Sequence, residues 1–187
     1  MRIKEKEVTL KNGRKVILRS PDTADAEAVI QHFSITSGET YFMARYPEEI
    51  VITVEEEKEF LRKLNEDEDN FMIAAFLDGQ LVGNAGVLKI QDFIKLRHRG
   101  GFGISIREHV CGLGLGTLML LEVIEQAKHT GFEQLELEVF ADNKRAKHLY
   151  ENMGFQQVGI LPRACKLKDG TYRDEIQMVR FLDQETE

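Results

Sequence analysis

The 187-residue chain has little of what small secreted, metal-binding or fibrous proteins use: it contains two cysteines, three prolines and no tryptophan. Cys111 and Cys165 cannot form the disulfide framework of a small secreted domain, and neither lies in a Cys-x-x-Cys or Cys/His spacing typical of zinc sites. With so few prolines and no tract of a single residue type, a collagen-like or low-complexity chain is excluded. We therefore expect free thiols and no metal site.

Long apolar runs are also absent. No run approaches the roughly 18 to 20 residues needed to cross a bilayer, and the N-terminal sequence MRIKEKEVTL alternates charges where a signal peptide would be apolar. Lys and Arg number 25 against 32 Asp and Glu, a net charge of −7 that repels phosphate backbones. We expect a cytoplasmic protein that binds neither membranes nor nucleic acid and whose partners are neutral or cationic.

What is present is the composition of one globular domain, with 42% hydrophobic and 30% charged residues. Asn12-Gly13 and Asp78-Gly79 each join two β-type runs and predict hairpins. The periodicity of the apolar residues predicts a helix over 26–33. Thr53 and Glu56 form a capping-box pattern that starts a second helix.

The remaining runs complete a pattern of alternating strands and helices without an internal repeat or a flexible linker. The predicted strands are 8–10, 14–18, 71–77, 80–90, 96–106, 134–140, 156–161 and 172–182, and the later helices are 115–127 and 143–152. We predict a single α/β (α+β) domain over residues 1–187, with a mixed, mostly antiparallel central sheet flanked by helices.

The most informative stretch is Cys111-Gly-Leu-Gly-Leu-Gly-Thr117, at a predicted junction of strand and helix. Glycines there bring successive backbone N–H groups and a helix N-terminus to one point, which favours a bound anion such as a diphosphate. No Gly-Lys-Ser/Thr follows, so the loop is not a P-loop, and the glycine spacing departs from the dinucleotide fingerprint. An ordinary tight turn is the structural alternative.

Downstream, the chain reads Asn143-x-x-Ala146-x-x-Leu149-Tyr150-x-x-x-Gly154-Phe155. The glycine loop followed by this motif resembles the GNAT superfamily of N-acetyltransferases, and the order of elements is similar to that fold over nearly the whole chain. The resemblance implies transfer of an acetyl group from acetyl-CoA to a primary amine. The acceptor would be a small molecule or a peptide or protein N-terminus that attacks the thioester directly.

The resemblance also implies roles for individual residues. Tyr150 would protonate the departing thiolate, a role that suits a phenol because its pKa is about 10. Cys111 stands where the family usually has Arg or Gln at the start of the loop, which places the strength of cofactor binding in doubt. The residues that would bind the coenzyme are Ile104, Ser105, Ile106, Gly112, Leu113, Gly114, Leu115, Gly116, Thr117 and Asn143.

The acceptor side carries weaker signals. The attacking amine must lose a proton, and His98 is a candidate base because an imidazole side chain ordinarily titrates near neutrality, although a solvated position in the basic patch 95–99 is the alternative. Glu39 is a candidate for binding the ammonium group of the acceptor, and Glu138 alternates with apolar residues on its strand and has the same two interpretations. The acidic segment 48–69 favours a cationic acceptor.

Two other functions stay open at this point. A catalytically silent module that binds acyl-CoA and regulates a partner would have the same fold, and Tyr150 argues against it. A dinucleotide-binding oxidoreductase is disfavoured by the glycine spacing. The sequence does not decide the oligomeric state, and a homodimer is one alternative.

Overall fold

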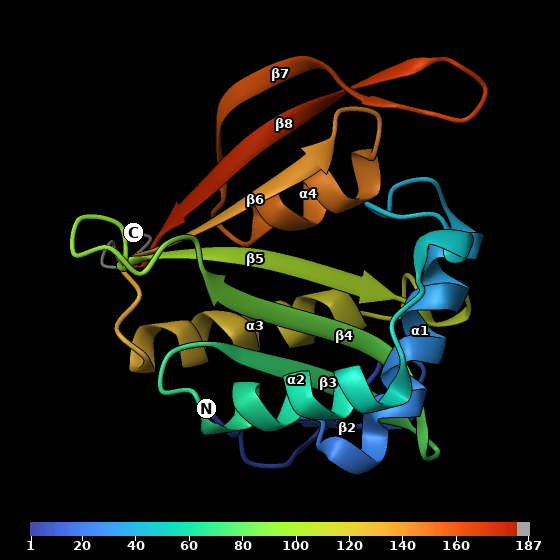
Figure 1. The fold of residues 1–187 in the computed structure, drawn as a ribbon, viewed down its shortest axis with the longest axis vertical. Coiled ribbons are helices and arrows are strands. Elements are labelled where there is room, and N and C mark those ends of the chain that lie inside the picture. Colours follow the sequence, from blue (N-terminus) through green and yellow to red (C-terminus); the bar gives the residue numbers. More distant parts are fainter. Residues whose placement is uncertain (183–187) are drawn as a thin grey trace.

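The computed structural model describes residues 1–182, and the last residues of the predicted domain, 183–187, lie outside the described part. The described chain forms one eight-stranded sheet in the order β1-β2-β3-β4-β5-β6-β8-β7 (Figure 1). Every neighbouring pair is antiparallel except β5 and β6, which are parallel. The predicted mixed, mostly antiparallel sheet is confirmed.

The elements alternate much as the hydrophobic pattern predicts. The strands are β1 (Lys6–Thr9), β2 (Lys15–Arg19), β3 (Phe71–Leu77), β4 (Gln80–Lys89), β5 (Arg99–Ile106), β6 (Gln134–Phe140), β7 (Gln156–Lys166) and β8 (Tyr172–Phe181). The helices are α1 (Ala26–Glu39), α2 (Val54–Glu66), α3 (Leu115–His129) and α4 (Lys144–Asn152), with short 3-10 turns η1 (Thr23–Asp25), η2 (Pro47–Glu49) and η3 (Glu108–Val110).

Local signals account for several element ends. Thr53 Oγ1 accepts from the Glu56 amide and the Glu56 carboxylate accepts from the Thr53 amide, so the capping box starts α2 as predicted. Gly13 and Gly79 have φ of +83° and +79° and make the turns of the two predicted hairpins.

The predicted strand 96–106 is wrong at its start, since β5 begins at Arg99. The amides of Leu96 and Arg97 both donate to the Phe93 carbonyl, which closes a tight turn over residues 93–97. Local hydrogen bonds therefore replace the strand ladder there. Strand β7 runs five residues beyond the predicted end at Leu161, with an irregularity at Arg163, whose φ is +55°.

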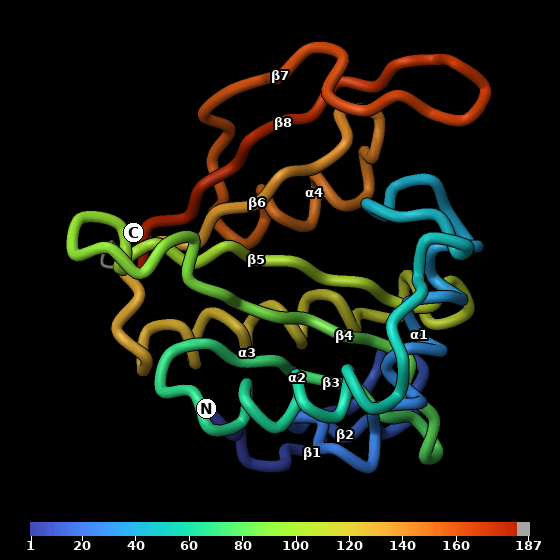
Figure 2. Tube along the Cα trace, in the orientation of Figure 1, coloured from blue at the N-terminus to red at the C-terminus, as the bar shows by residue number. Residues whose placement is uncertain are grey.

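Helices cover both faces of the sheet. Helices α1 and α2 pack Val29 and Leu61 against Ala74 and Leu81 of β3 and β4. On the other face, α3 and α4 join a larger core that includes Tyr150. The tube in Figure 2 shows α1 beside the start of β4 and the end of β5, far from the loop before β5.

The sheet is split between its two parallel strands. Pairing between β5 and β6 covers only Arg99 to Gly101 and Gln134 to Glu136. Beyond these residues the strands diverge, as the ribbon in Figure 1 and the tube in Figure 2 show. Strands β8 and β7 continue the sheet beyond β6. The sheet therefore has two parts, β1 to β5 and β6-β8-β7, which are joined only where β5 and β6 begin.

The turn between β7 and β8 also contacts the segment that follows α1. The Lys168 amide, in the β7–β8 turn, donates to the Tyr46 hydroxyl (3.0 Å), and the Lys168 ammonium pairs with Glu48. Residues 40–49 therefore connect α1 to the β7–β8 hairpin. Within residues 1–182, no helix is both long and apolar enough to span a membrane.

Candidate active site

The split between β5 and β6 opens a cleft of about 770 Å³. Strand β5 continues to Ile106 and β6 to Phe140, but past Gly101 and Glu136 neither has the other as a partner. The backbone N–H and C=O groups on these two edges are left for a ligand, because buried backbone groups are rarely left unpaired. An extended molecule carrying amide groups can pair with such an edge as a strand would.

The glycine loop lies at one end of this cleft, between η3 and α3. Gly112 and Gly114 have φ of +81° and +90°, which other residues rarely adopt. Within residues 1–182, none of the backbone amides of 112–117 donates to a backbone carbonyl. A Cβ on Gly116 would lie 3.0 Å from Leu149, so only glycine lets α4 approach this closely. The loop thus offers several free N–H donors and the positive end of α3 to an anion.

A cation that sequence reasoning missed lies over this loop. The Lys11 amide donates to the Leu113 carbonyl (3.0 Å), and the Lys11 side chain passes across Gly114, with Cε 3.5 Å from the position of a glycine Cβ. Lys11 belongs to the turn between β1 and β2, about a hundred residues earlier in the chain. No local pattern marks it, because its position depends on how the hairpin packs beside α3.

Tyr150 lines the cleft from α4 and is 7% exposed. Its ring packs against Phe102 and Phe155, with centroids 6.2 and 5.8 Å away. Burial raises the pKa of the phenol to about 12, so the hydroxyl stays protonated at neutral pH. That hydroxyl makes no hydrogen bond to another residue of the described chain. A neutral proton donor without a protein partner therefore faces the cleft.

The two faces of β5 differ sharply. Phe102 points into the core with Tyr150, whereas the alternate residues Gly101, Gly103 and Ser105 face α1. A Cβ on Gly103 would have nothing within 4 Å. Gly101 and Gly103 therefore leave part of the cleft toward α1 and α2 without side chains, and we call this part the glycine floor.

His32 joins α1 to this floor. Its Nε2 lies 2.8 Å from Ser105 Oγ, and the residue is fully buried. Burial, with the nearby positive charge of Arg107, lowers its pKa to about 4. The imidazole is therefore neutral at physiological pH and serves as a hydrogen-bonding link between helix and strand.

Carboxylates gather on the wall across from the glycine floor. Leu137 and Val139 of β6 point into the core, so Glu138 faces the other way, and Glu175 of β8 lines the same cleft. The Cys165 thiol lies 3.3 Å from Glu175, and burial followed by this carboxylate raises the thiol pKa to about 11.

Comparison with known proteins decides the family. Residues 30–155 match the model of the acetyltransferase (GNAT) family. The chain belongs to the GNAT acetyltransferase family. It is 28% identical over 109 residues to the L-amino acid N-acetyltransferase AaaT of Escherichia coli, a match that covers 58% of this chain and 66% of that protein, just under two thirds of its length. It is 30% identical over 120 residues to the alanine N-acetyltransferase of ribosomal protein bS18 from Haemophilus influenzae, covering 64% of this chain and 78% of the relative.

Solved GNAT structures share the fold. The acetyltransferase of the GNAT family from Streptococcus pneumoniae superposes with a TM-score of 0.85 at 29% identity, covering 89% of this chain and 98% of that one. A GNAT superfamily phosphinothricin acetyltransferase from Sinorhizobium meliloti, solved in complex with acetyl-CoA, superposes at 0.77 with 17% identity, covering 89% of this chain and 88% of that one. In this chain, the free amides of the loop could bind an anionic group such as a diphosphate, and the unpaired edges of the cleft could pair with an extended arm that carries amide groups.

The fold brings most of the predicted site residues to one place. Those that line the cleft are Glu39, Ile104, Ser105, Ile106, Asn143 and Tyr150, while Gly112, Leu113, Gly114, Leu115, Gly116 and Thr117 form the adjacent loop and the start of α3. Asn143 caps α4, since its Oδ1 accepts from the Ala146 amide (3.2 Å). The Glu39 carboxylate accepts from the Glu108 amide (2.8 Å), so this residue also orders the segment before the loop.

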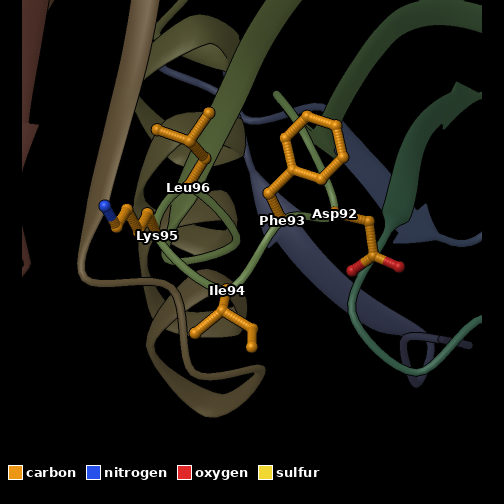
Figure 3. A pocket seen from close by; sticks show the side chains of 5 residues that line it. All are labelled: Asp92, Phe93, Ile94, Lys95 and Leu96. Carbon is orange, nitrogen blue, oxygen red and sulfur yellow. The ribbon is translucent and has the colours of Figure 1, made fainter.

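His98 is not brought to the cleft. It lies in the turn before β5, at the opposite end of that strand from Ser105, and its carbonyl accepts from the Glu133 amide (2.9 Å). Near it, residues 92–96 form a shallow hollow in which Phe93 and Ile94 are 67% and 82% exposed (Figure 3). This hollow is lined by a single turn and lies apart from Tyr150 and the glycine loop.

Proposed function

We propose that this GNAT protein transfers the acetyl group of acetyl-CoA to a primary amine by direct attack of the amine on the thioester. The acceptor is a small molecule or a peptide N-terminus. The observation that carries the proposal is the position of Tyr150: its buried side chain lines the cleft between β5 and β6, and its hydroxyl has no partner among the described residues.

The coenzyme would be held mainly by backbone groups. The amides of residues 112–117 would bind the diphosphate, and the free edge of β5 from Ile104 to Ile106 would pair with the pantetheine arm. Lys11, whose side chain crosses Gly114, would supply the positive charge that Cys111 lacks at the start of the loop. Asn143 would contact the same arm from the start of α4.

The chemistry requires the acceptor nitrogen to lose two protons and the departing sulfur to gain one. Acetyl-CoA supplies an activated acetyl group and a thiolate leaving group. The carboxylate of Glu138 takes the first proton from the acceptor ammonium, directly or through water, so that the amine lone pair can form the new C–N bond as the C–S bond breaks. Tyr150 gives its proton to the departing sulfur. The nitrogen, positively charged once the C–N bond has formed, releases its second proton to water and leaves a neutral amide, and Tyr150 regains a proton from solvent. No acyl-enzyme is formed, so Cys111 has no covalent role.

The test is a turnover assay in which release of the coenzyme thiol is followed with amino acids, amino acid amides, polyamines, aminoglycosides and short peptides. Acetyl-CoA binding is measured by calorimetry in parallel. Amine-dependent thiol release, with mass spectrometry showing an N-acetylated product, supports the proposal. Tight acetyl-CoA binding without turnover of any amine would instead favour a silent regulatory module.

A further inference from the structure

Asn84 is an unpaired polar side chain on the side of the cleft toward α1 and α2, which we take as the acceptor side. It sits on β4, opposite Ser105 of β5, and therefore faces α1 like the glycine floor. The residue is 4% exposed and lines the cleft, yet its Oδ1 is buried without a hydrogen-bond partner. No other described residue bonds to either end of the carboxamide. A buried amide left this way costs free energy unless a ligand pairs with it.

The charged side chains that line the cleft are mostly negative. Of the described residues that line it, four are carboxylates, namely Glu39, Glu108, Glu138 and Glu175, and one is a cation, Arg145 on α4. Such a lining attracts an ammonium group and repels a carboxylate.

The rest of the acceptor side is apolar. Phe33 and Met72 pack with the core between the sheet and α1 and α2, and Phe60 and Leu88 line the cleft while still 38% and 45% exposed. Together with the open space above Gly103, these side chains leave room for an apolar group beside Asn84.

We propose that the acceptor is a peptide-type amine, an α-amine followed by a neutral amide group that Asn84 recognises, rather than a free amino acid. A carboxamide and a peptide group are matched partners because each has one N–H donor face and one carbonyl acceptor. A free amino acid would instead bring a carboxylate into a cleft that four carboxylates already line. The apolar residues that line the same cleft receive the side chain that the amine carries. This inference rests on the proposed acetyl transfer and names the class of its acceptor.

The experiment compares leucinamide with leucine, which differ only in the group that Asn84 would meet. Values of kcat/KM are compared at equal concentrations of unprotonated amine, because the carboxamide lowers the pKa of the neighbouring amine. We expect kcat/KM for leucinamide to exceed that for leucine by about tenfold or more, the scale of one lost hydrogen bond together with charge repulsion. Equal values, or a preference for leucine, would overturn the proposal.

The variant Asn84→Leu tests the residue itself, because leucine has nearly the same shape and removes only the polar atoms. It should reduce kcat/KM for leucinamide about tenfold and leave that for leucine and for isoamylamine unchanged. Acetyl-CoA affinity and the melting temperature should not fall, since the variant removes an unsatisfied buried group. Asn152→Leu, on the exposed face of α4, is the matched control.

The outcomes distinguish failure of the acceptor class from failure of the proposed acetyl transfer. An unchanged ratio of leucinamide to leucine in Asn84→Leu would assign the preference elsewhere and refute recognition by Asn84. Acetylation confined to polyamines or other amines without an amide would refute the acceptor class while leaving acetyl transfer intact. If no amine is acetylated although acetyl-CoA binds, both the acceptor class and the proposed function fail.

Discussion

At the scale of single residues, the packing of Tyr150 can be separated from the proton donation that we propose for it. Its ring fills the core beside Phe102 and Phe155, while its hydroxyl has no partner in the described chain. Removing the ring would leave a cavity, whereas removing the oxygen alone breaks no hydrogen bond. A variant that keeps the ring is therefore a clean probe of proton donation.

We predict that Tyr150→Phe lowers kcat by roughly 10²-fold, the usual scale of general-acid catalysis, without weakening acetyl-CoA binding. The reason is that only the proton donor is lost. Steady-state kinetics on an identified amine and calorimetry on the same preparation provide the measurement, with thermal unfolding as the control for packing. A kcat within about threefold of the parent enzyme, at a chemistry-limited step, would leave the acid role to water.

Lys11 is the second residue whose role can be measured alone. We predict that Lys11→Gln raises the dissociation constant of coenzyme A by about three- to tenfold, because one cation beside the diphosphate is lost. The change should shrink as salt is increased from 50 mM to about 500 mM, since screening weakens the same contact in the parent protein. Lys4→Gln, an exposed substitution with the same charge change, should bind like the parent. Equal affinities for both variants would contradict this role.

At the scale of elements, β5 has one face that is closely packed and one that is open. A Cβ on Gly100 would stand 2.7 Å from Val87 and 3.1 Å from Leu135, whereas a Cβ on Gly103 would meet nothing within 4 Å. Two glycines three residues apart on one strand therefore serve different purposes. Gly100 allows close approach within the core, and Gly103 leaves space in the cleft.

We predict that Gly100→Ala lowers the free energy of unfolding by about 1–3 kcal/mol, through overpacking, and that Gly103→Ala changes it by less than about 0.5 kcal/mol. Chemical denaturation of both variants is the measurement. Gly103→Phe should fold and bind acetyl-CoA but lose turnover, because the ring occupies the acceptor side of the cleft. Retained turnover in that folded variant would show that the acceptor binds elsewhere.

At the scale of the whole molecule, His32 connects the helical layer to the strand that borders the cleft. Its pKa is lowered from 6.5 to about 4 in the folded protein, first by burial and then by the charge of Arg107. Between these two values the unfolded chain binds a proton that the folded chain does not. The contribution of His32 to the free energy of unfolding is therefore fully present above pH 6.5 and is lost as the pH falls toward 4.

We predict that the free energy of unfolding of the parent protein decreases between pH 6.5 and pH 5 with a slope approaching about 1.4 kcal/mol per pH unit from His32 alone. In His32→Gln this contribution should disappear, because glutamine does not titrate. Urea unfolding at several pH values in this window measures the difference, and the remaining histidines are common to both proteins. Parallel pH profiles for the two proteins would refute the buried neutral state of His32.

The sequence by itself determined the elements and the family. The signals for these elements depend only on a few neighbouring residues, so each could be identified from a short stretch of sequence. They are the spacing of apolar residues, turn pairs such as Asn12-Gly13, and the capping box at Thr53. The glycine loop and the Tyr150 motif predicted the GNAT family because each is a short contiguous pattern. The start of β5 was misassigned because the turn at Phe93 replaces the strand with local hydrogen bonds that no periodicity reveals.

Only the tertiary structure decided which side chains share the cleft. The approach of Lys11 to Gly114, the unpaired carboxamide of Asn84 and the distance of His98 from the cleft all depend on contacts between segments far apart in the chain. The split of the sheet after Gly101 is equally invisible in the sequence, because a strand with one unpaired edge has the same residue pattern as a paired one. Local patterns define elements through short-range physics, whereas the position of an unpaired group is set by the packing of the complete fold.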